Sequence, residues 1–409
     1  MSIKAVIFDL DGTLLDTLGD LTSAVNAAMR HYQFPLLSES EVCARVGNGV
    51  RRLIAQSVPA NTETHVIDDC LKHFQAHYEA HLVERTHPYQ GIGAVIEAFH
   101  SRGVRMAVLS NKYQAAAERL ISHYFPNRIT LIRGEIPGIP RKPDPTSTNQ
   151  ILSMLSVQAD EVLYIGDSDV DMQTAKAAGI TAIGALWGFR DRESLMAAGA
   201  EHVVEHPEHL IQLLDRLQLD AAMQAFERNG FTWTFCATSA QAADYVASQC
   251  RGKTIGMGGS VTLDTLGIYD MLKKEDAQVF WHWKGDEIRS TGDVFLTSAN
   301  AISATGEIVN IDGACNRIAA SVYGFDTCYV VCGINKLTPD MDSAMRRARE
   351  IAAPLNTKRL GKRTPCTVDG QCHDCHSPER ICRAMTILMA PPSRMSHYEI
   401  IMVGENIGY

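Results

Sequence analysis

The stretch that decides the fold is AVIFDLDGTLLD, residues 5–16, where an apolar run ends in Asp9, Asp11 and Asp16. A short apolar run bounded by turn residues predicts a buried strand that reaches the surface at Asp9. Two carboxylates about 4 Å apart repel each other by roughly 4 kcal/mol at an effective dielectric constant of 20. A bound cation is the expected means of offsetting that repulsion, although Asp-Gly between apolar runs is also typical of a β-turn.

The length and composition of the chain limit its class. Its 409 residues are too many for one ordinary core and predict two or three domains. The hydrophobic content of 45% and the charged content of 21% are typical of a soluble globular protein, and a net charge of −9 argues against nucleic-acid or membrane-surface binding. The first residues, MSIKAVIF, resemble neither a signal peptide nor a membrane span. These features predict a cytoplasmic location.

Short apolar runs alternate with helical patterns through the first half, with strands expected at 4–10, 105–111, 161–167 and 181–186. This alternation predicts a parallel α/β sheet with right-handed crossovers. Residues 17–87 show helical patterns only, so we expect a helical cap inserted into a core made of residues 1–16 and 88–215. The alternation restarts after a long helical stretch that begins at 208, and residues 216–409 are expected to form a second α/β domain.

Polar side chains follow the ends of the expected strands, where ligands bind in open parallel sheets. Carboxylate oxygens are the ligands that Mg²⁺ prefers, and an ammonium and a hydroxyl suit a phosphate group. Because Asp9 ends its strand, we expect it to attack phosphorus, while Asp11, two residues further, moves the proton. The other candidates are Ser110, Asn111, Lys142, Asp167 and Asp171.

The motifs DLDGTLLD, LSNK, KPDP and GDSDVDMQTAKAAG occur in this order and are followed by GALWGF. With them, residues 1 to about 215 resemble the phosphatases of the haloacid dehalogenase superfamily, and most closely its phosphoglycolate phosphatases. The resemblance implies a Rossmann-like core, an aspartyl-phosphate formed on Asp9 and an acid–base role for Asp11. It also implies phosphate binding by Ser110, Asn111 and Lys142, and Mg²⁺ binding by Asp9, the Asp11 carbonyl and Asp167 with support from Asp171.

The segment RVGNGVRRL resembles the cap loop that touches substrate in this family. It makes Asn48, Gly49, Arg51 and Arg52 candidate substrate contacts, and an arginine fork suits a substrate carboxylate. A solvated helix face is the competing explanation for the two arginines. Gln90 departs from the family, which usually has proline there.

The second half contains KTIGMGGSVTLDTLGI, residues 253–268, in which a strand pattern leads through glycines into a helical pattern. Gly258, Gly259 and Ser260 are a candidate anion-binding loop, and a tight strand-to-helix turn is the alternative. The stretches GMGGSVTL, TGEIVNIDG, NRIA, GINK and VGENIGY resemble the LUD domain of lactate-utilization proteins. That resemblance implies an α/β fold similar to CoA transferases and sugar-phosphate isomerases, and an association with lactate oxidation. Cys315 departs from it, because the usual residue there is glycine.

Four cysteines lie within 17 residues at the spacing C-x5-C-x2-C-x6-C: Cys366, Cys372, Cys375 and Cys382. Four thiolates this close in a reducing compartment predict a soft metal. An iron–sulfur cluster would use all four, and zinc would use cysteines with or without His373 or His376. Metal-free thiols or a redox disulfide stay open as well. Six other cysteines are expected in the core: Cys43, Cys70, Cys236, Cys250, Cys328 and Cys332.

Together these features predict a cytoplasmic, Mg²⁺-dependent hydrolase of small phosphorylated metabolites. Its LUD-like half would bind a metabolite or a redox partner of lactate oxidation. The alternative is a redox or interaction module of 2-hydroxy-acid metabolism in which the phosphatase half is regulatory.

Overall fold

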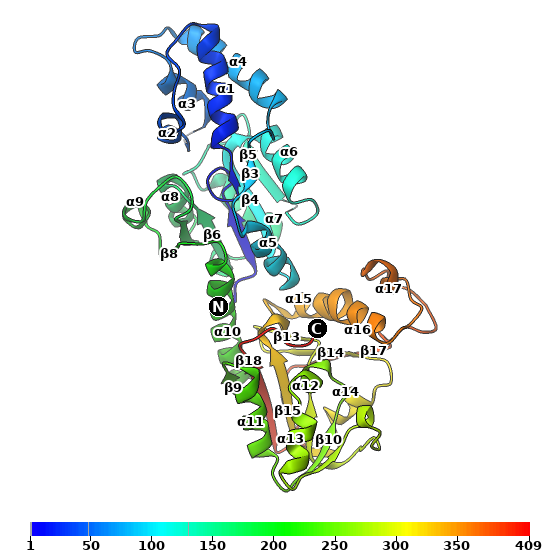
Figure 1. Ribbon diagram of the computed structural model, residues 1–409. Coiled ribbons are helices and arrows are strands. Elements are labelled where there is room, and N and C mark those ends of the chain that lie inside the picture. The colour runs from blue at the N-terminus through cyan, green and yellow to red at the C-terminus, as the bar shows by residue number, and fades with distance from the viewer. Residues whose placement is uncertain (1, 48, 130) are drawn as a thin grey trace. The chain divides into compact units, whose positions relative to one another are not determined.

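The computed structural model describes residues 2–47, 49–129 and 131–409. They form two compact units, each with its own sheet and core (Figure 1). One unit comprises residues 3–100 and 104–214, and the other comprises residues 101–103 and 215–409 together with Ser2. Among the described residues, no helix has both the length and the apolar character needed to cross a membrane.

The sheet of the first unit has six parallel strands, in the order β5-β4-β1-β6-β7-β8. β1 (Ala5–Phe8) lies between β4 (Arg105–Tyr113) and β6 (Val162–Gly166), and all its residues are buried. A strand buried on both faces needs a continuous apolar run, which is why AVIF predicts it. The other strands are β5 (Leu131–Glu135), β7 (Thr181–Ala185) and β8 (His202–Val204). The predicted parallel α/β core is confirmed.

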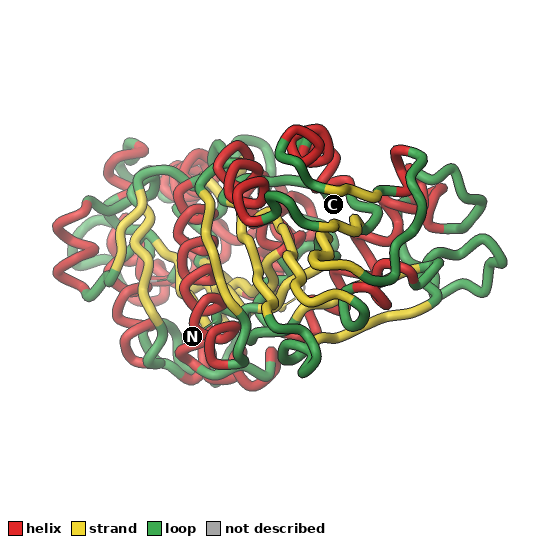
Figure 2. The backbone as a smooth tube through the Cα atoms, turned by 90° about the horizontal axis from the view of Figure 1, so that it is seen from below, coloured by secondary structure: helices red, strands yellow, loops and turns green. Residues whose placement is uncertain are grey.

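Helices connect these strands, and Figure 2 shows strands lying side by side among helices. α8 begins directly after β6 because Ser168 and Asp171 form a capping box. The Ser168 hydroxyl accepts a hydrogen bond from the Asp171 amide, and the Asp171 carboxylate accepts one from the Ser168 amide. The cap therefore holds Asp171 beside the end of a central strand. The helices are α5 (Ile92–Ser101), α6 (Gln114–Tyr124), α7 (Thr146–Leu155), α8 (Asp169–Ala177) and α9 (Arg192–Ala198).

A helical cap follows β1 in the chain and joins the core through two short strands. β2 (Leu15–Asp16) pairs antiparallel with β3 (His87–Pro88), so the chain leaves the core and returns to it side by side. The buried Asp20 carboxylate accepts hydrogen bonds from the Arg85 and Thr86 amides, which fastens the two connections together. The cap helices are α1 (Leu18–His31), α2 (Glu39–Cys43), α3 (Val50–Ser57) and α4 (Thr64–Ala80).

The second unit contains another parallel six-stranded sheet, in the order β11-β10-β12-β15-β18-β9. Its strands are β9 (Thr232–Cys236), β10 (Thr254–Met257), β11 (Gln278–Phe280), β12 (Gly292–Thr297), β15 (Phe325–Gly333) and β18 (His397–Val403). All six strands lie within residues 216–409, where the sequence predicts a second α/β domain.

A second, smaller sheet in this unit is absent from the sequence-based expectation. It has the order β16-β13-β14-β17 and mixes parallel and antiparallel pairs. Two of its strands, β13 with three residues and β16 with two, are too short to show the alternation that marks a strand. They are β13 (Ala301–Ser303), β14 (Ile308–Asp312), β16 (Leu337–Thr338) and β17 (Ala384–Leu388).

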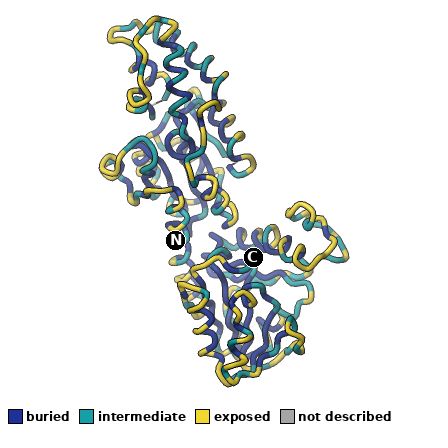
Figure 3. The backbone as a smooth tube through the Cα atoms, viewed as in Figure 1, coloured by how far each residue is buried: buried dark blue, intermediate teal, exposed yellow. Residues whose placement is uncertain are grey.

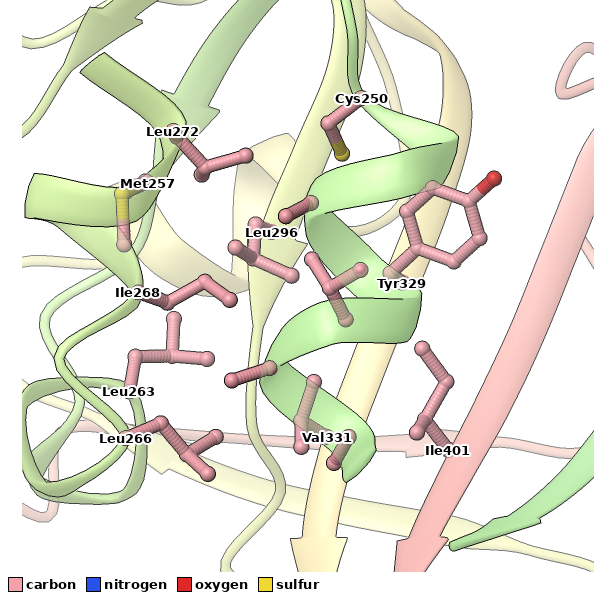
Figure 4. Packing of buried hydrophobic residues seen from close by; sticks show 14 of the residues in the cluster. Cys250, Met257, Leu263, Leu266, Ile268, Leu272, Leu296, Tyr329, Val331 and Ile401 are labelled. Atoms are coloured by element: carbon pink, nitrogen blue, oxygen red, sulfur yellow. The ribbon is translucent and has the colours of Figure 1, made fainter. Parts of the chain in front are cut away.

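Helices pack an apolar core onto the larger sheet of the second unit. Figure 4 shows Leu263 and Ile268 from two of these helices directed toward Leu296 and Val331 of the sheet. The helices are α10 (His209–Arg228), which contains the boundary between the units, α11 (Ser239–Gln249), α12 (Val261–Thr265), α13 (Ile268–Lys274), α14 (Asn316–Ala320), α15 (Met341–Arg347), α16 (Ala353–Arg359) and α17 (Cys366–Asp369).

The sequence predicts buried core positions for six cysteines, and the structure agrees for all but one of them. Five of the six expected core cysteines are buried, whereas Cys43 in the cap is half-buried. The four cysteines of residues 366–382 are all half-buried, in a segment around α17 that is largely exposed (Figure 3). All of these thiols are free.

Candidate active site

Asp9 stands at the end of β1, where the strand ladder of the first sheet stops. Its amide still donates to the Ile165 carbonyl at 2.9 Å, so the pairing with β6 extends to this residue. The side chain is only 7% exposed. Lys142 Nζ forms an ion pair with Asp9 Oδ1 at 2.9 Å, but among the described residues this buried oxygen accepts no hydrogen bond.

Asp9, Asp167 and Asp171 bring carboxylate oxygens within 4.8 Å of one another, and all three are buried. Asp167 accepts hydrogen bonds from the Thr13 hydroxyl at 3.0 Å and from the Phe189 amide at 2.8 Å. Lys142 Nζ donates to Asp171 Oδ1 at 2.6 Å, so one ammonium contacts two of the three carboxylates. A buried acidic triad with one cation has more negative than positive charge.

Burial and mutual repulsion disturb the titration of this triad. Burial, followed by the charge of Asp171, raises the pKa of Asp9 to about 7 against the opposing effect of Lys142. Burial, with Asp171 and Asp9, also raises the pKa of Asp167 well above its ordinary value. Burial alone would lower the pKa of Lys142, but Asp171 and Asp9 outweigh it and raise that pKa. These directions describe a site that gains from added positive charge.

Glycines allow the backbone to approach Asp167 closely. Gly12 has φ +89°, and a Cβ atom there would lie 2.2 Å from Asp167 Oδ2. A Cβ atom on Gly188 would lie 2.3 Å from the Asp167 Cβ. Neither position therefore has room for a side chain. The GALWGF motif contacts Asp167 through Gly188 as well as through the Phe189 amide.

Asp11 is not part of the triad, but it lines the same cavity as Asp9. Its Oδ1 accepts hydrogen bonds from the Thr17 hydroxyl at 2.7 Å and from Lys112 Nζ at 2.9 Å. Lys112 is 3% exposed, and its ammonium lies 4.6 Å from the ring centroid of Tyr78 in the cap helix α4. Lys112 is not among the site residues predicted from the sequence. Its position at the end of a buried strand was the available signal, because a lysine there needs a charged partner.

The predicted phosphate contacts lie together at the same edge of the sheet. Ser110 and Asn111 lie near the end of β4 and line a cavity of about 40 Å³ with Lys142, Asp9 and Asp11. The Asn111 side chain accepts from the Lys142 amide at 3.0 Å and donates to the Gly47 carbonyl at 3.0 Å. One amide thus fixes both the lysine loop and the cap loop.

The cap contributes to this cavity differently from the expectation. Gly49 lines it, but the exposed Arg51 and Arg52 are not among its described lining residues. Arg51 instead pairs with Asp68 of α4 at 2.9 Å. Asn48 lies outside the described residues. The arginine that the described lining does contain is the half-buried Arg190, which donates to the Val46 carbonyl at 3.3 Å and which follows GALWGF directly.

The candidate anion loop of the second unit is only partly available to a ligand. The Gly258 amide donates to the Leu296 carbonyl at 2.9 Å, so it belongs to the strand ladder. Gly259 and Ser260 line a separate cavity of about 570 Å³. The cysteines, in contrast, converge: Cys366, Cys372, Cys375 and Cys382 all line one cavity of about 30 Å³, together with His373.

The first half resembles known phosphatases over its whole length. A phosphoglycolate phosphatase from Mesorhizobium japonicum is 31% identical over 235 residues, which are 56% of this chain and 100% of the relative. One from Rhodospirillum rubrum is 34% identical over 205 residues, 48% of this chain and 85% of the relative. An N-acetylmuramic acid 6-phosphate phosphatase from Pseudomonas aeruginosa is 29% identical over 222 residues, 54% of this chain and 98% of the relative.

A solved structure agrees with this similarity. A provisionally assigned phosphoglycolate phosphatase from Lactobacillus delbrueckii subsp. bulgaricus superposes with a TM-score of 0.50 at 31% identity, over 52% of this chain and 99% of its own. Residues 6–185 match the haloacid dehalogenase-like hydrolases, and residues 219–398 match the LUD domain. The chain therefore belongs to the haloacid dehalogenase-like hydrolase family through its first half and carries a LUD domain in its second half.

Proposed function

We propose that the first unit hydrolyses small phosphomonoesters through a covalent phosphate ester of Asp9. The observation that supports it best is the unsatisfied Asp9 Oδ1, buried beside Lys142 and two further carboxylates at the edge of a parallel sheet. The lone pair of this oxygen is open to form a bond to phosphorus, and the neighbouring ammonium would hold a phosphoryl oxygen. The named phosphatases among the relatives support the same chemistry.

Magnesium suits the donor set, which consists only of oxygens and carries excess negative charge. Asp9, Asp167 and the Asp11 carbonyl would hold the ion, with Asp171 in support. When bound, Mg²⁺ neutralises charge on the phosphoryl oxygens.

The residues of the chain divide the reaction into two steps. In the first, an Asp9 oxygen bonds to phosphorus while the bond to the alcohol oxygen breaks, and Asp11 gives that oxygen a proton. In the second, water attacks phosphorus, Asp11 takes the proton of the water, and the bond to Asp9 breaks to release inorganic phosphate. Lys142, Ser110 and Asn111 hold the phosphoryl oxygens through both steps.

We infer that the substrate also carries a carboxylate. The two kinds of named relatives act on different molecules, but both substrates are acids as well as phosphate esters. Among the described cations of the cavity wall, Arg190 is the one without a close carboxylate, since its contact with Asp169 is 3.9 Å. A guanidinium fork binds a carboxylate through two parallel hydrogen bonds.

A panel of phosphomonoesters tests this function directly. Asp9→Asn should lower turnover of every substrate by about 10⁴-fold or more, as loss of a nucleophile does elsewhere. Asp16→Asn is the matched control in the same motif, because the Asp16 carboxylate accepts a hydrogen bond from the Leu18 amide and is not among the described residues that line the cavity. EDTA should abolish the wild-type activity and Mg²⁺ should restore it. Equal activity of the wild type and Asp9→Asn would favour the regulatory alternative.

For the second unit we propose a metabolite-binding LUD domain whose cysteine loop holds an iron–sulfur cluster. Four sulfurs around one zinc ion lie about 3.8 Å apart, given Zn–S bonds of about 2.3 Å. All four cysteines line one cavity, yet among the described residues no three potential ligand atoms of this loop come within 4.8 Å of one another. An iron–sulfur cluster takes all four thiolates, and all four line this one cavity.

Metal analysis of protein purified without oxygen tests the cluster. We expect iron and sulfide, with visible absorbance that Cys375→Ser removes and that Cys43→Ser, a half-buried cysteine of the cap, leaves intact. Zinc in place of iron would support the alternative metal, and absence of both would end the metal proposal.

A further inference from the structure

The geometry points to a binding site for a small organic polyanion, bearing carboxylate or phosphate groups, in the 570 Å³ cavity of the second unit, with Lys336 as its buried anchor. It rests on the metabolite-binding role proposed for the LUD domain and adds the ligand class and the residues. The volume is within the range typical of small-molecule sites.

Lys336 is a buried cation without a matching anion. It follows β15, is 4% exposed and lines the cavity. Its ammonium donates to the Thr262 hydroxyl at 2.7 Å and to the Ser298 hydroxyl at 2.9 Å. No carboxylate of the described residues forms an ion pair with it. A buried ammonium without an ion partner is costly, and a ligand anion in the cavity offsets that cost.

A second cation, Arg317 of α14, lies in the same cavity wall. Its guanidinium is held by the Asn310 side chain at 2.8 Å and by the Asn300 side chain at 3.1 Å. The nearest carboxylate in an ion pair, that of Asp312, is 3.9 Å away. The guanidinium also donates to the Ser298 carbonyl at 3.2 Å and to the Ile311 carbonyl at 2.6 Å. Neutral acceptors therefore occupy its terminal N–H groups, and it contributes positive charge to the wall more than free donors.

Further cations surround the outer part of the cavity. Arg359 and Lys362 are exposed, and Arg380 and Arg383 come from the segment that carries the cysteines. In all, the lining contains six cationic and two acidic side chains: Arg317, Lys336, Arg359, Lys362, Arg380 and Arg383, against Asp312 and Glu379. Glu379 is already paired with an arginine outside the lining, Arg363, at 2.7 Å.

The two groups of cations explain why the ligand should have more than one anionic group. A single carboxylate or phosphate satisfies Lys336 in the interior but leaves the outer arginines to water. A molecule with two anionic ends reaches both, and each charge-assisted contact adds affinity. The cysteine loop forms part of the wall, since Arg380 donates to the Cys375 carbonyl at 2.8 Å and to the Cys382 carbonyl at 3.1 Å.

Calorimetry on the full chain in EDTA tests the site. The probes are succinate and phosphonoacetate, which phosphatases do not hydrolyse, with acetate and inorganic phosphate as single-group comparators. We expect at least one two-group probe to bind more tightly than its comparator. Lys336→Met should weaken that binding at least tenfold, and Arg359→Gln at the exposed edge should weaken it severalfold without risk to the fold. Lys358→Met, an exposed neighbour outside the lining, is the matched control and should change nothing.

The outcomes separate the site from the broader role. If a probe binds and both Lys336→Met and Arg359→Gln bind it like the wild type, the assignment of this cavity is wrong while a metabolite-binding domain stands. If neither two-group probe binds, the polyanion proposal itself is overturned. A preference for succinate identifies carboxylates as the ligand groups, and a preference for phosphonoacetate identifies a phosphorus oxyanion. Phosphonoacetate and phosphate also suit the site proposed for the first unit, so the titrations are repeated with Arg190→Met, which changes that site and not the cavity of the second unit. Binding that survives Arg190→Met and is lost in Lys336→Met belongs to the second unit, and Asp9→Asn tests the phosphatase separately.

Discussion

Lys336→Met should stabilise the second unit at neutral pH, by an amount that falls as the pH rises. Burial lowers the pKa of Lys336 from 10.5 to about 8; Cys332 opposes this shift, and the charges of Arg347 and Arg317 assist it. Thr262 and Ser298 face the ammonium with hydroxyls, which do not titrate in this range. The folded protein therefore holds the charged lysine less favourably than the unfolded chain does.

The size and sign of the effect follow from linkage. Between about pH 8 and 10.5 the unfolded chain keeps the proton that the folded protein has lost, so the free energy of unfolding of the wild type rises with pH. At about 1.4 kcal/mol per pH unit, the charged lysine costs the folded state about 3 kcal/mol at pH 7 and about 1 kcal/mol at pH 9.5. The stability difference between Lys336→Met and the wild type should therefore shrink by about 2 kcal/mol across this range.

Urea unfolding followed by tryptophan fluorescence measures this difference. Trp233, Trp281 and Trp283 belong to the second unit, and a Trp187→Phe background removes the tryptophan of the first unit. Hydrogen bonds lost by Thr262 and Ser298 add a constant that does not change with pH, so the change with pH is the diagnostic quantity. A stability difference that stays the same from pH 7 to pH 9.5 would refute the buried, uncompensated ammonium.

Three further predictions concern the first unit. Gly12→Ala should remove most activity, because the new Cβ would lie 2.2 Å from Asp167 Oδ2; normal turnover would contradict the close approach. Lys112→Met should lower kcat about tenfold or more. It should add little to the loss caused by Asp11→Asn, because both substitutions break the same Lys112–Asp11 ion pair. Additive losses would argue against positioning of Asp11 by Lys112. Arg190→Met should raise KM about tenfold for substrates with a carboxylate and leave KM for other phosphomonoesters unchanged; an equal rise for both would contradict carboxylate recognition.

The sequence predicts the arrangement of the first unit well because its strands are buried on both faces. AVIF is a continuous apolar run, so β1 is visible without any tertiary information. Asp9 and Asp167 follow two such runs, and parallel strands bring their ends to one edge. The convergence of these carboxylates is therefore a direct consequence of topology.

The sequence does not predict contacts that depend on the direction of a side chain. Arg51 and Arg52 carry the right charge, but α3 directs them to solvent, whereas Arg190 reaches the cavity from a loop with no periodic pattern. Lys112 lies near the end of β4 and Lys336 lies three residues after β15. Lys112 has a carboxylate partner, whereas Lys336 has none among the described residues, and the packed structure is needed to tell them apart. Burial of a charge is a tertiary property that composition and spacing do not encode.

The narrow junction formed by β2 and β3 has a consequence for how this protein diversifies. Because the paired strands leave and rejoin the core about 5 Å apart, a lid of different length or composition can be inserted there without disturbing the central sheet. Selectivity and reactivity can thus evolve on separate parts of the same chain, one by exchange of the insertion and the other by retention of the strand ends.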